Sequence, residues 1–237
     1  MSTIEATTAL SDVVTRRPDS AAVLEAFGLD YCCGGARSLA EACDTAEIDI
    51  EDVLARLGQE APVEAPADWA SLGPAELVDE LERTHHTYLG HALARISDLL
   101  TKVVDVHAES HPELHDIEAT YSELRNDLEP HLLKEEQILF PMIRELYATT
   151  DVPTFHCGTL RNPISVMCFE HDRAGELLTQ LRAQTSTYTP PSDGCASYQA
   201  LFAAMAELEA DTHLHIHKEN NVLFPAVIAE ELHRASS

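Results

Sequence analysis

The sequence has few basic side chains, few aromatic ones and no long apolar run. Lysine and arginine total 15 against 41 aspartates and glutamates, which gives the 237 residues a formal net charge of −26. Such a surface repels phosphate groups, so neither nucleic acids nor anionic membranes are expected as partners. No apolar run approaches the ~18 residues of a membrane span. The first twelve residues carry acids without a long apolar segment, so we expect no signal peptide.

The cysteines lack the spacing of a structural zinc site. No two of them form a CxxC pair, which excludes zinc ribbons and thioredoxin-like redox motifs. Because no signal peptide is expected, we interpret them as reduced thiols of a cytoplasmic protein. The six are Cys32, Cys33, Cys43, Cys157, Cys168 and Cys195. Histidine, by contrast, is abundant, with 13 residues against 15 lysines and arginines, and this directs attention to metal binding.

Proline and glycine divide the chain into three parts. Residues 1–58 read as a small unit of short helices, in which Ser38 and Glu41 form a capping box before a helix over 39–46. Residues 59–74 contain three prolines among alanines and acids and are predicted to be a linker. Within the first unit, residues 30–35 (DYCCGG) form a tight loop that contains Cys32 and Cys33.

Residues 75–237 show helical periodicity throughout. Apolar residues recur at alternating steps of three and four in four separate segments, which predicts four long amphipathic helices packed as an up-down bundle. The fold class is therefore all-α. Beyond the middle of the second and fourth helices, the same spacing places Ile138, Val222 and Ala226 on the inward faces.

Each apolar stripe contains a histidine, and two also contain a glutamate. His131 and Glu135 lie four residues apart, as do His215 and Glu219, so each pair shares one helix face. The segment from His131 to Pro141 repeats from His215 to Pro225. A charged carboxylate on a core face is costly unless it is paired or bound to metal. Together with His86 and His171, these pairs predict a core with four imidazoles and two carboxylates.

This donor set suits two metal ions. Four nitrogens and two carboxylates without a thiolate fit iron, manganese or zinc. If both glutamates bridge, an octahedral metal keeps free positions for an oxo bridge and a small ligand, which favours iron over a closed structural site. Occupation by a single metal or by zinc fits the same residues.

Several other polar residues compete for a role. His85 is the nearest rival of His86, because the upstream helix suits either register. His213 and His217 flank His215 but point to other faces, so we expect them at the surface. Glu170 and Asp127 are most simply solvated acids, although next to the ligands they could also orient imidazoles, carry protons or give released iron a path.

With these motifs, the chain resembles the Repair of Iron Centers family of ScdA/YtfE-like di-iron proteins. The resemblance rests on DYCCGG, on KEEQILFPMI, PISVM and ENNVLFP, and covers nearly the whole chain. It implies a small ScdA-type domain followed by a hemerythrin-like bundle with a non-haem di-iron centre. The two irons would be held by His86, His131, Glu135, His171, His215 and Glu219, with both glutamates bridging. A cytoplasmic homodimer is implied as well.

The resemblance also implies a function, the restoration of iron–sulfur clusters damaged by nitric oxide or oxidants. The partners would be the damaged cluster proteins and nitric oxide or oxygen species, with Cys32 and Cys33 as candidate reactive thiols. Two alternatives remain open: a nitric-oxide reductase or peroxidase-type enzyme, and an oxygen or nitric-oxide sensor. Oxygen-carrying hemerythrins have a further histidine where this chain has Gly175, which argues against a carrier. Cys168 stands where an acidic residue is more usual, and the roles of Cys168 and Cys157 are undefined.

Overall fold

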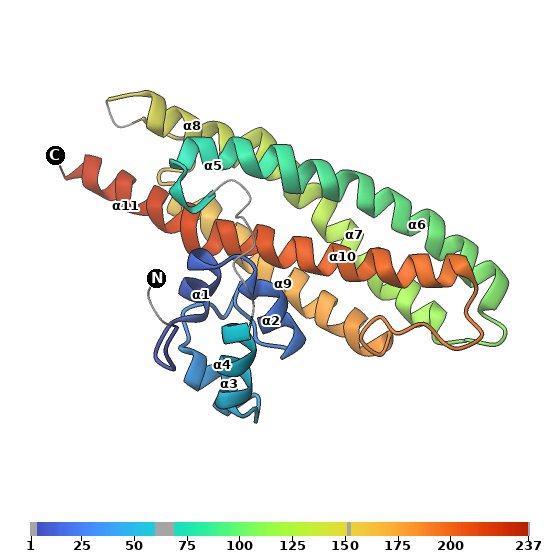
Figure 1. The fold of residues 1–237 in the computed structure, drawn as a ribbon. Coiled ribbons are helices and arrows are strands. Elements are labelled where there is room, and N and C mark those ends of the chain that lie inside the picture. Colours follow the sequence, from blue (N-terminus) through green and yellow to red (C-terminus); the bar gives the residue numbers. More distant parts are fainter. Residues whose placement is uncertain (1–3, 60–68, 151–152, 237) are drawn as a thin grey trace.

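The computed structural model describes residues 4–59, 69–150 and 153–236, and these parts are helical without any β-strand. The N-terminal helices are α1 (Leu10–Arg16), α2 (Ser20–Ala26), α3 (Leu39–Thr45) and α4 (Ile50–Gln59). In Figure 1 they gather on one side of the long helices, against α10. The predicted all-α class is confirmed. No helix of the described residues is both long enough and apolar enough to cross a membrane.

Four long rods make up the rest of the molecule, and three of them are interrupted by one π-helical turn. The first is α5 (Pro74–Leu81), η2 (Glu82–His86) and α6 (Thr87–His107). The second is α7 (Leu114–Lys134), η3 (Glu135–Leu139) and α8 (Phe140–Ala148). The third is the uninterrupted α9 (Arg161–Gln184). The fourth is α10 (Ala196–Lys218), η4 (Glu219–Leu223) and α11 (Phe224–Ala235). The rods pack side by side as the predicted bundle, α7 against α9 and α10 against α6 (Figure 1).

The N-terminal unit begins its third helix as the sequence predicts. The Ser38 hydroxyl accepts the main-chain N–H of Glu41, and the Glu41 carboxylate accepts the N–H of Ser38, so the capping box is present. The predicted linker falls largely on residues 60–68, which lie outside the described residues. A short 3₁₀ turn, η1 (Trp69–Ser71), precedes the first rod, and the Trp69 side chain in it is buried.

The π-helical turns change which residues face inward. Each turn adds one residue to the helical period, so the apolar stripe downstream moves by one position. At the end of η3 the inward residue is Leu139, while Ile138 is 45% exposed. At the end of η4 and after it the fully buried residues are Leu223 and Val227, whereas the predicted Val222 and Ala226 are only partly buried. The predictions for Ile138 and Ala226 were therefore wrong, because they assumed an uninterrupted α-helix. Val222 is partly buried and packs against the core cluster.

The apolar core of the bundle is divided in two. One cluster combines the N-terminal unit with α6, α7, α9 and α10, and the other combines α5, α8, α11 and the start of α9. A layer of buried histidines and glutamates separates the two clusters. This position excludes water from both sides of the polar layer, which raises the electrostatic cost of any charge left uncompensated there.

Candidate metal centre

The structure brings the six predicted ligands together in the polar layer. All six side chains are buried, the two glutamates completely. They form two overlapping groups, in each of which the donor atoms lie within 4.8 Å of one another. The first group contains His86 and His215, the second contains His131 and His171, and Glu135 and Glu219 belong to both. This is the arrangement expected of two ions that share two carboxylates.

The distances between donor atoms fit metal ligation. The Nε2 atoms of His131 and His171 are 3.1 Å apart. Two neighbouring ligands of an octahedral ion with bonds of about 2.1 Å would lie about 3.0 Å apart. Glu219 approaches His171 Nε2 at 3.1 Å and His215 Nε2 at 3.2 Å through its two different oxygens.

Glu135 is placed in the same way between the other rings. Its Oε2 atom lies 3.5 Å from His86 Nε2 and 3.4 Å from His131 Nε2. Each carboxylate therefore lies between one histidine of each group.

The donor set is unsatisfied within the protein. Both oxygens of Glu135 and of Glu219, and Nε2 of His86 and of His215, are buried without a hydrogen-bond partner among the described residues. Buried polar atoms are almost always paired, so six unpaired donor atoms at one point fit a bound cation. The residues thus fit a metal pair.

Burial sets the protonation states of the centre. It lowers the pKa of His131, and it lowers that of His215 to about 3, so these imidazoles stay neutral with a free lone pair. Burial, followed by repulsion from Glu219, raises the pKa of Glu135 well above its usual value. Burial also opposes ionisation of Glu219, but the neighbouring imidazoles of His215 and His171 hold its pKa well below that value. A cation between the carboxylates would remove their mutual repulsion.

Three polar side chains fix the orientation of ligand rings by binding Nδ1, the nitrogen on the far side of the ring. Glu136 lies 3.0 Å from His86 Nδ1, and Asn220 lies 2.8 Å from His171 Nδ1. Glu136 and Asn220 each follow a shared glutamate, so they occupy the same position in the two repeats. Such outer partners determine the tautomer and the aim of a ligating histidine. Sequence analysis missed both, although their place in the repeat was a usable signal.

Glu170 is the third orienting residue. Its carboxylate lies 2.9 Å from His131 Nδ1 and also binds Lys134. The prediction of a solvated acid was therefore wrong for Glu170, and the alternative, an orienting role, matches its position. Asp127 is half-exposed and lies 3.8 Å from Arg173.

The remaining histidines have other surroundings. His85 is buried, bonds Asp211 through Nδ1 at 2.9 Å and stacks on His215, but it belongs to neither ligand group. His217 is completely buried, 3.1 Å from the Thr15 hydroxyl. The surface position predicted for His217 is wrong because the N-terminal unit covers this face of α10. The surface position predicted for His213 is not observed either, because its side chain is largely covered by the N-terminal unit, with Nδ1 at 3.7 Å from Glu25.

The candidate thiols lie outside the polar layer. Cys32 is buried and Cys33 half-buried in the loop before α3, and neither is in a disulfide. Asn221, in the π turn η4, donates from Nδ2 to the main-chain oxygen of Cys32 at 2.9 Å, so the thiol loop is attached next to the shared Glu219. Cys168 Sγ lies 3.4 Å from Asn220 Oδ1.

Comparisons with known proteins match both parts of the chain. Residues 77–227 match the hemerythrin HHE cation-binding domain, and residues 6–61 match the ScdA_N domain, described as of unknown function. The chain is thus a hemerythrin-like protein with a ScdA-type N-terminal domain.

Similar curated proteins show to which family of hemerythrin-like proteins the chain belongs. The chain is 35% identical to the protein named "Iron-sulfur cluster repair protein YtfE" of Escherichia coli O157:H7, over 94% of this chain and 97% of the relative. The proteins of the same name from Shigella boydii serotype 4 and Escherichia coli K12 match with the same identity and coverage. The chain belongs to the family of these YtfE-type proteins, which confirms the resemblance found in its sequence.

Proposed function

We propose that this protein repairs iron–sulfur clusters damaged by nitric oxide or oxidants, and that it does so with a pair of iron ions. His86 and His215 would hold one ion and His131 and His171 the other, with Glu135 and Glu219 bridging. The observation that carries the proposal is the set of six buried, unpaired donor atoms at the centre. The printed name of the relatives supports cluster repair as the task.

Iron bound there would supply redox and Lewis-acid chemistry at its open coordination positions. The protein's own residues keep the imidazoles of His131 and His215 neutral by burial. They also aim three of the four ligand rings through Nδ1 contacts and exclude water with apolar layers on both sides. A cavity of about 270 Å³ reaches His131 and His171 from the surface and is lined by Glu170 and Asp127. It offers a route by which a small ligand or an iron ion can reach or leave the centre.

The test is a transfer experiment without oxygen. The protein is loaded with ⁵⁷Fe and mixed with an enzyme whose [4Fe–4S] cluster has been damaged by nitric oxide. We expect the enzyme to regain activity and its cluster to contain ⁵⁷Fe, which Mössbauer spectroscopy detects. The His131→Ala variant, and free ferrous iron at the same concentration, serve as controls and should restore less activity.

Other outcomes separate the competing functions. Recovery without ⁵⁷Fe in the cluster would contradict iron donation. Formation of nitrous oxide by the reduced protein, with no repair, would favour the nitric-oxide reductase. Reversible oxygen binding over many cycles, again with no repair, would favour the sensor.

Two further parts of the proposal concern the oligomeric state of the protein and its cellular compartment. A cytoplasmic homodimer is proposed on the family resemblance alone, with Cys32 and Cys33 as its reactive thiols. Sedimentation of the purified chain at micromolar concentration should give twice the mass of 26.0 kDa, and a single-chain mass would contradict the dimer.

A further inference from the structure

The loop that contains the two neighbouring cysteines presents three donor atoms to one point. The sulfur atoms of Cys32 and Cys33 are 3.8 Å apart, and Cys32 Sγ lies 3.2 Å from Asp30 Oδ1. All three donors lie within 4.8 Å of one another. Both thiols are free, and their separation is far longer than the ~2.05 Å of a disulfide bond.

These separations match a chelate. Two thiolates bound to a tetrahedral ion at about 2.3 Å lie about 3.8 Å apart. A carboxylate oxygen bound to the same ion at about 2.0 Å lies about 3.5 Å from each sulfur. The loop therefore holds its sulfurs at the chelating distance, with one carboxylate oxygen close to its expected position.

The loop is held in this shape by its own main chain. The Asp30 carboxylate accepts the N–H groups of Cys32, Cys33 and Gly34 at 2.8–3.0 Å. Gly35 approaches the rest of the molecule so closely that an added Cβ would lie 2.5 Å from the Tyr31 oxygen. The donors are thus positioned before any ion arrives, which lowers the entropic cost of binding.

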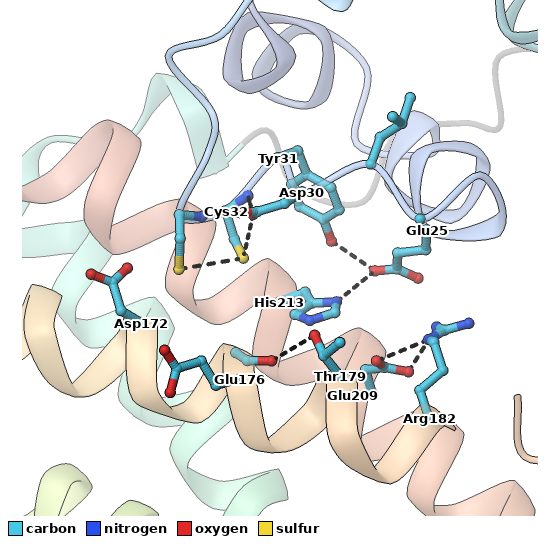
Figure 2. Close-up of a pocket in the computed structure, with 14 residues that line it drawn as sticks. Glu25, Asp30, Tyr31, Cys32, Asp172, Glu176, Thr179, Arg182, Glu209 and His213 are labelled. Atoms are coloured by element: carbon cyan, nitrogen blue, oxygen red, sulfur yellow. Dashed lines mark hydrogen bonds and ion pairs between the residues drawn. The ribbon is translucent and has the colours of Figure 1, made fainter. Parts of the chain in front are cut away.

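The loop opens into a cavity that favours cations. The cavity measures about 580 Å³ and lies between the N-terminal unit and α9 and α10. Five carboxylates line it against one arginine, and that arginine, Arg182, is paired with Glu209. Figure 2 shows Asp172 and Glu176 of α9 on the wall opposite the Cys32 loop. None of the described residues forms an ion pair with Asp172, so its carboxylate is available to an ion in the cavity.

We propose that Asp30, Cys32 and Cys33 form a second metal site, separate from the bundle centre, for a thiophilic divalent cation, with Asp172 among the cavity carboxylates that attract the cation. Binding releases two thiol protons to solvent and needs no oxidant or reductant. The adjacent Cys33 thiol, through its hydrogen bond, and burial raise the pKa of Cys32 well above its usual value, so without a cation this thiol stays protonated. Assigning the cation as ferrous iron in transit to or from the bundle rests on the proposed function, whereas binding itself does not.

The test is a cobalt titration of the full-length chain, kept reduced by a phosphine and free of oxygen. Cobalt(II) substitutes for ferrous iron and zinc, and its bonds to thiolates give an intense near-ultraviolet charge-transfer absorption. The bundle ligands are nitrogens and oxygens, so they cannot produce this absorption. We expect its final intensity to correspond to one thiolate-bound cobalt per chain, apart from the cobalt that the bundle takes up, and we expect it to disappear in Cys32→Ser and Cys33→Ser. Asp30→Asn should weaken binding at least about tenfold.

Cys195→Ser is the matched control, because it removes an exposed thiol at the far end of α10 and should leave the absorption unchanged. A second measurement does not depend on any variant: zinc should protect Cys32 and Cys33, but not Cys195, from alkylation by N-ethylmaleimide. Absence of the charge-transfer band in the unaltered protein, or an undiminished band in Cys33→Ser, would overturn the site. Failed cluster repair with the band intact would contradict the proposed function alone.

Discussion

Glu135 is predicted to affect the metal-free and the iron-loaded protein in opposite directions. Without metal, both its oxygens are buried and unpaired beside a second carboxylate. An unsatisfied buried acceptor costs about 1–3 kcal/mol. A charged acceptor costs more than a neutral one, and Glu135→Gln keeps the shape while it replaces the charge by a neutral amide. The metal-free variant should therefore be more stable than the metal-free parent, by about 1 kcal/mol or more.

In the iron-loaded protein, Glu135→Gln should lower the free energy of unfolding. Glu135 belongs to both ligand groups, so the substitution weakens the binding of both ions. Each hundredfold loss of affinity removes about 2.7 kcal/mol of metal-linked stability. Urea unfolding, followed by circular dichroism, is measured on chelator-treated and on reconstituted protein, with the iron content determined on the same samples.

The stability difference between the metal-free Gln variant and the metal-free parent also depends on pH. The pKa of Glu135 is raised in the folded chain from an ordinary value of 4.5, so the carboxyl contributes full stability only below about pH 4.5. That contribution is lost as the pH rises toward the folded pKa. The advantage of the metal-free Gln variant should therefore vanish near pH 4 and grow above it.

A surface glutamate of the same rod, in α7, is the control. Glu118 is half-exposed near His115, so Glu118→Gln should change neither form by more than about 0.5 kcal/mol. If Glu135→Gln lowered the stability of both forms equally, or retained both irons, the assignment of Glu135 as a shared metal ligand would fail.

Three further predictions concern other parts of the molecule. Glu170→Ala should weaken iron binding about 10- to 100-fold, measured by chelator competition, because a ligand imidazole loses its Nδ1 partner; unchanged affinity would contradict the orienting role. The pKa of Cys195 is lowered to about 7 by the main-chain N–H of Tyr198 and by the His107 imidazole. At pH 7 it should react with iodoacetamide about sixfold faster than an ordinary thiol, after correction for lower nucleophilicity, and its rate should level off above pH 8. Tandem mass spectrometry of the alkylated chain measures this, and a rate still rising at pH 9 would refute it. Gly35→Ala should destabilise the N-terminal unit by about 1–3 kcal/mol, because its Cβ would overlap main-chain and side-chain oxygens. Gly90→Ala, which meets nothing within 4 Å, should not destabilise.

The sequence was sufficient to predict the bundle and the six candidate ligands. Histidines and glutamates in otherwise apolar stripes, repeated in two halves, mark a buried polar layer, because uncompensated charge is too costly on a core face. His131 and Glu135 are four residues apart, so they lie on one helix face. His215 and Glu219 have the same spacing and lie on one face for the same reason.

What the sequence could not provide was the π-helical turns and the contacts between distant segments. The turn η3 moves Leu139 inward in place of Ile138, and no residue in it is an obvious helix breaker. His217 lies on a face of α10 that would be exposed to solvent without the N-terminal unit, which packs over it through Thr15. Both effects depend on packing between parts of the chain that are far apart in sequence.

The central claim is that two irons share the buried histidines and glutamates of the bundle. The most direct measurement is the iron content and Mössbauer spectrum of the chain reconstituted without oxygen, beside His131→Ala and His215→Ala. The account predicts two irons per chain in a coupled, non-haem environment and their loss from both variants, with the helical circular dichroism retained. A folded chain that binds no iron, or variants that keep both ions, would contradict it.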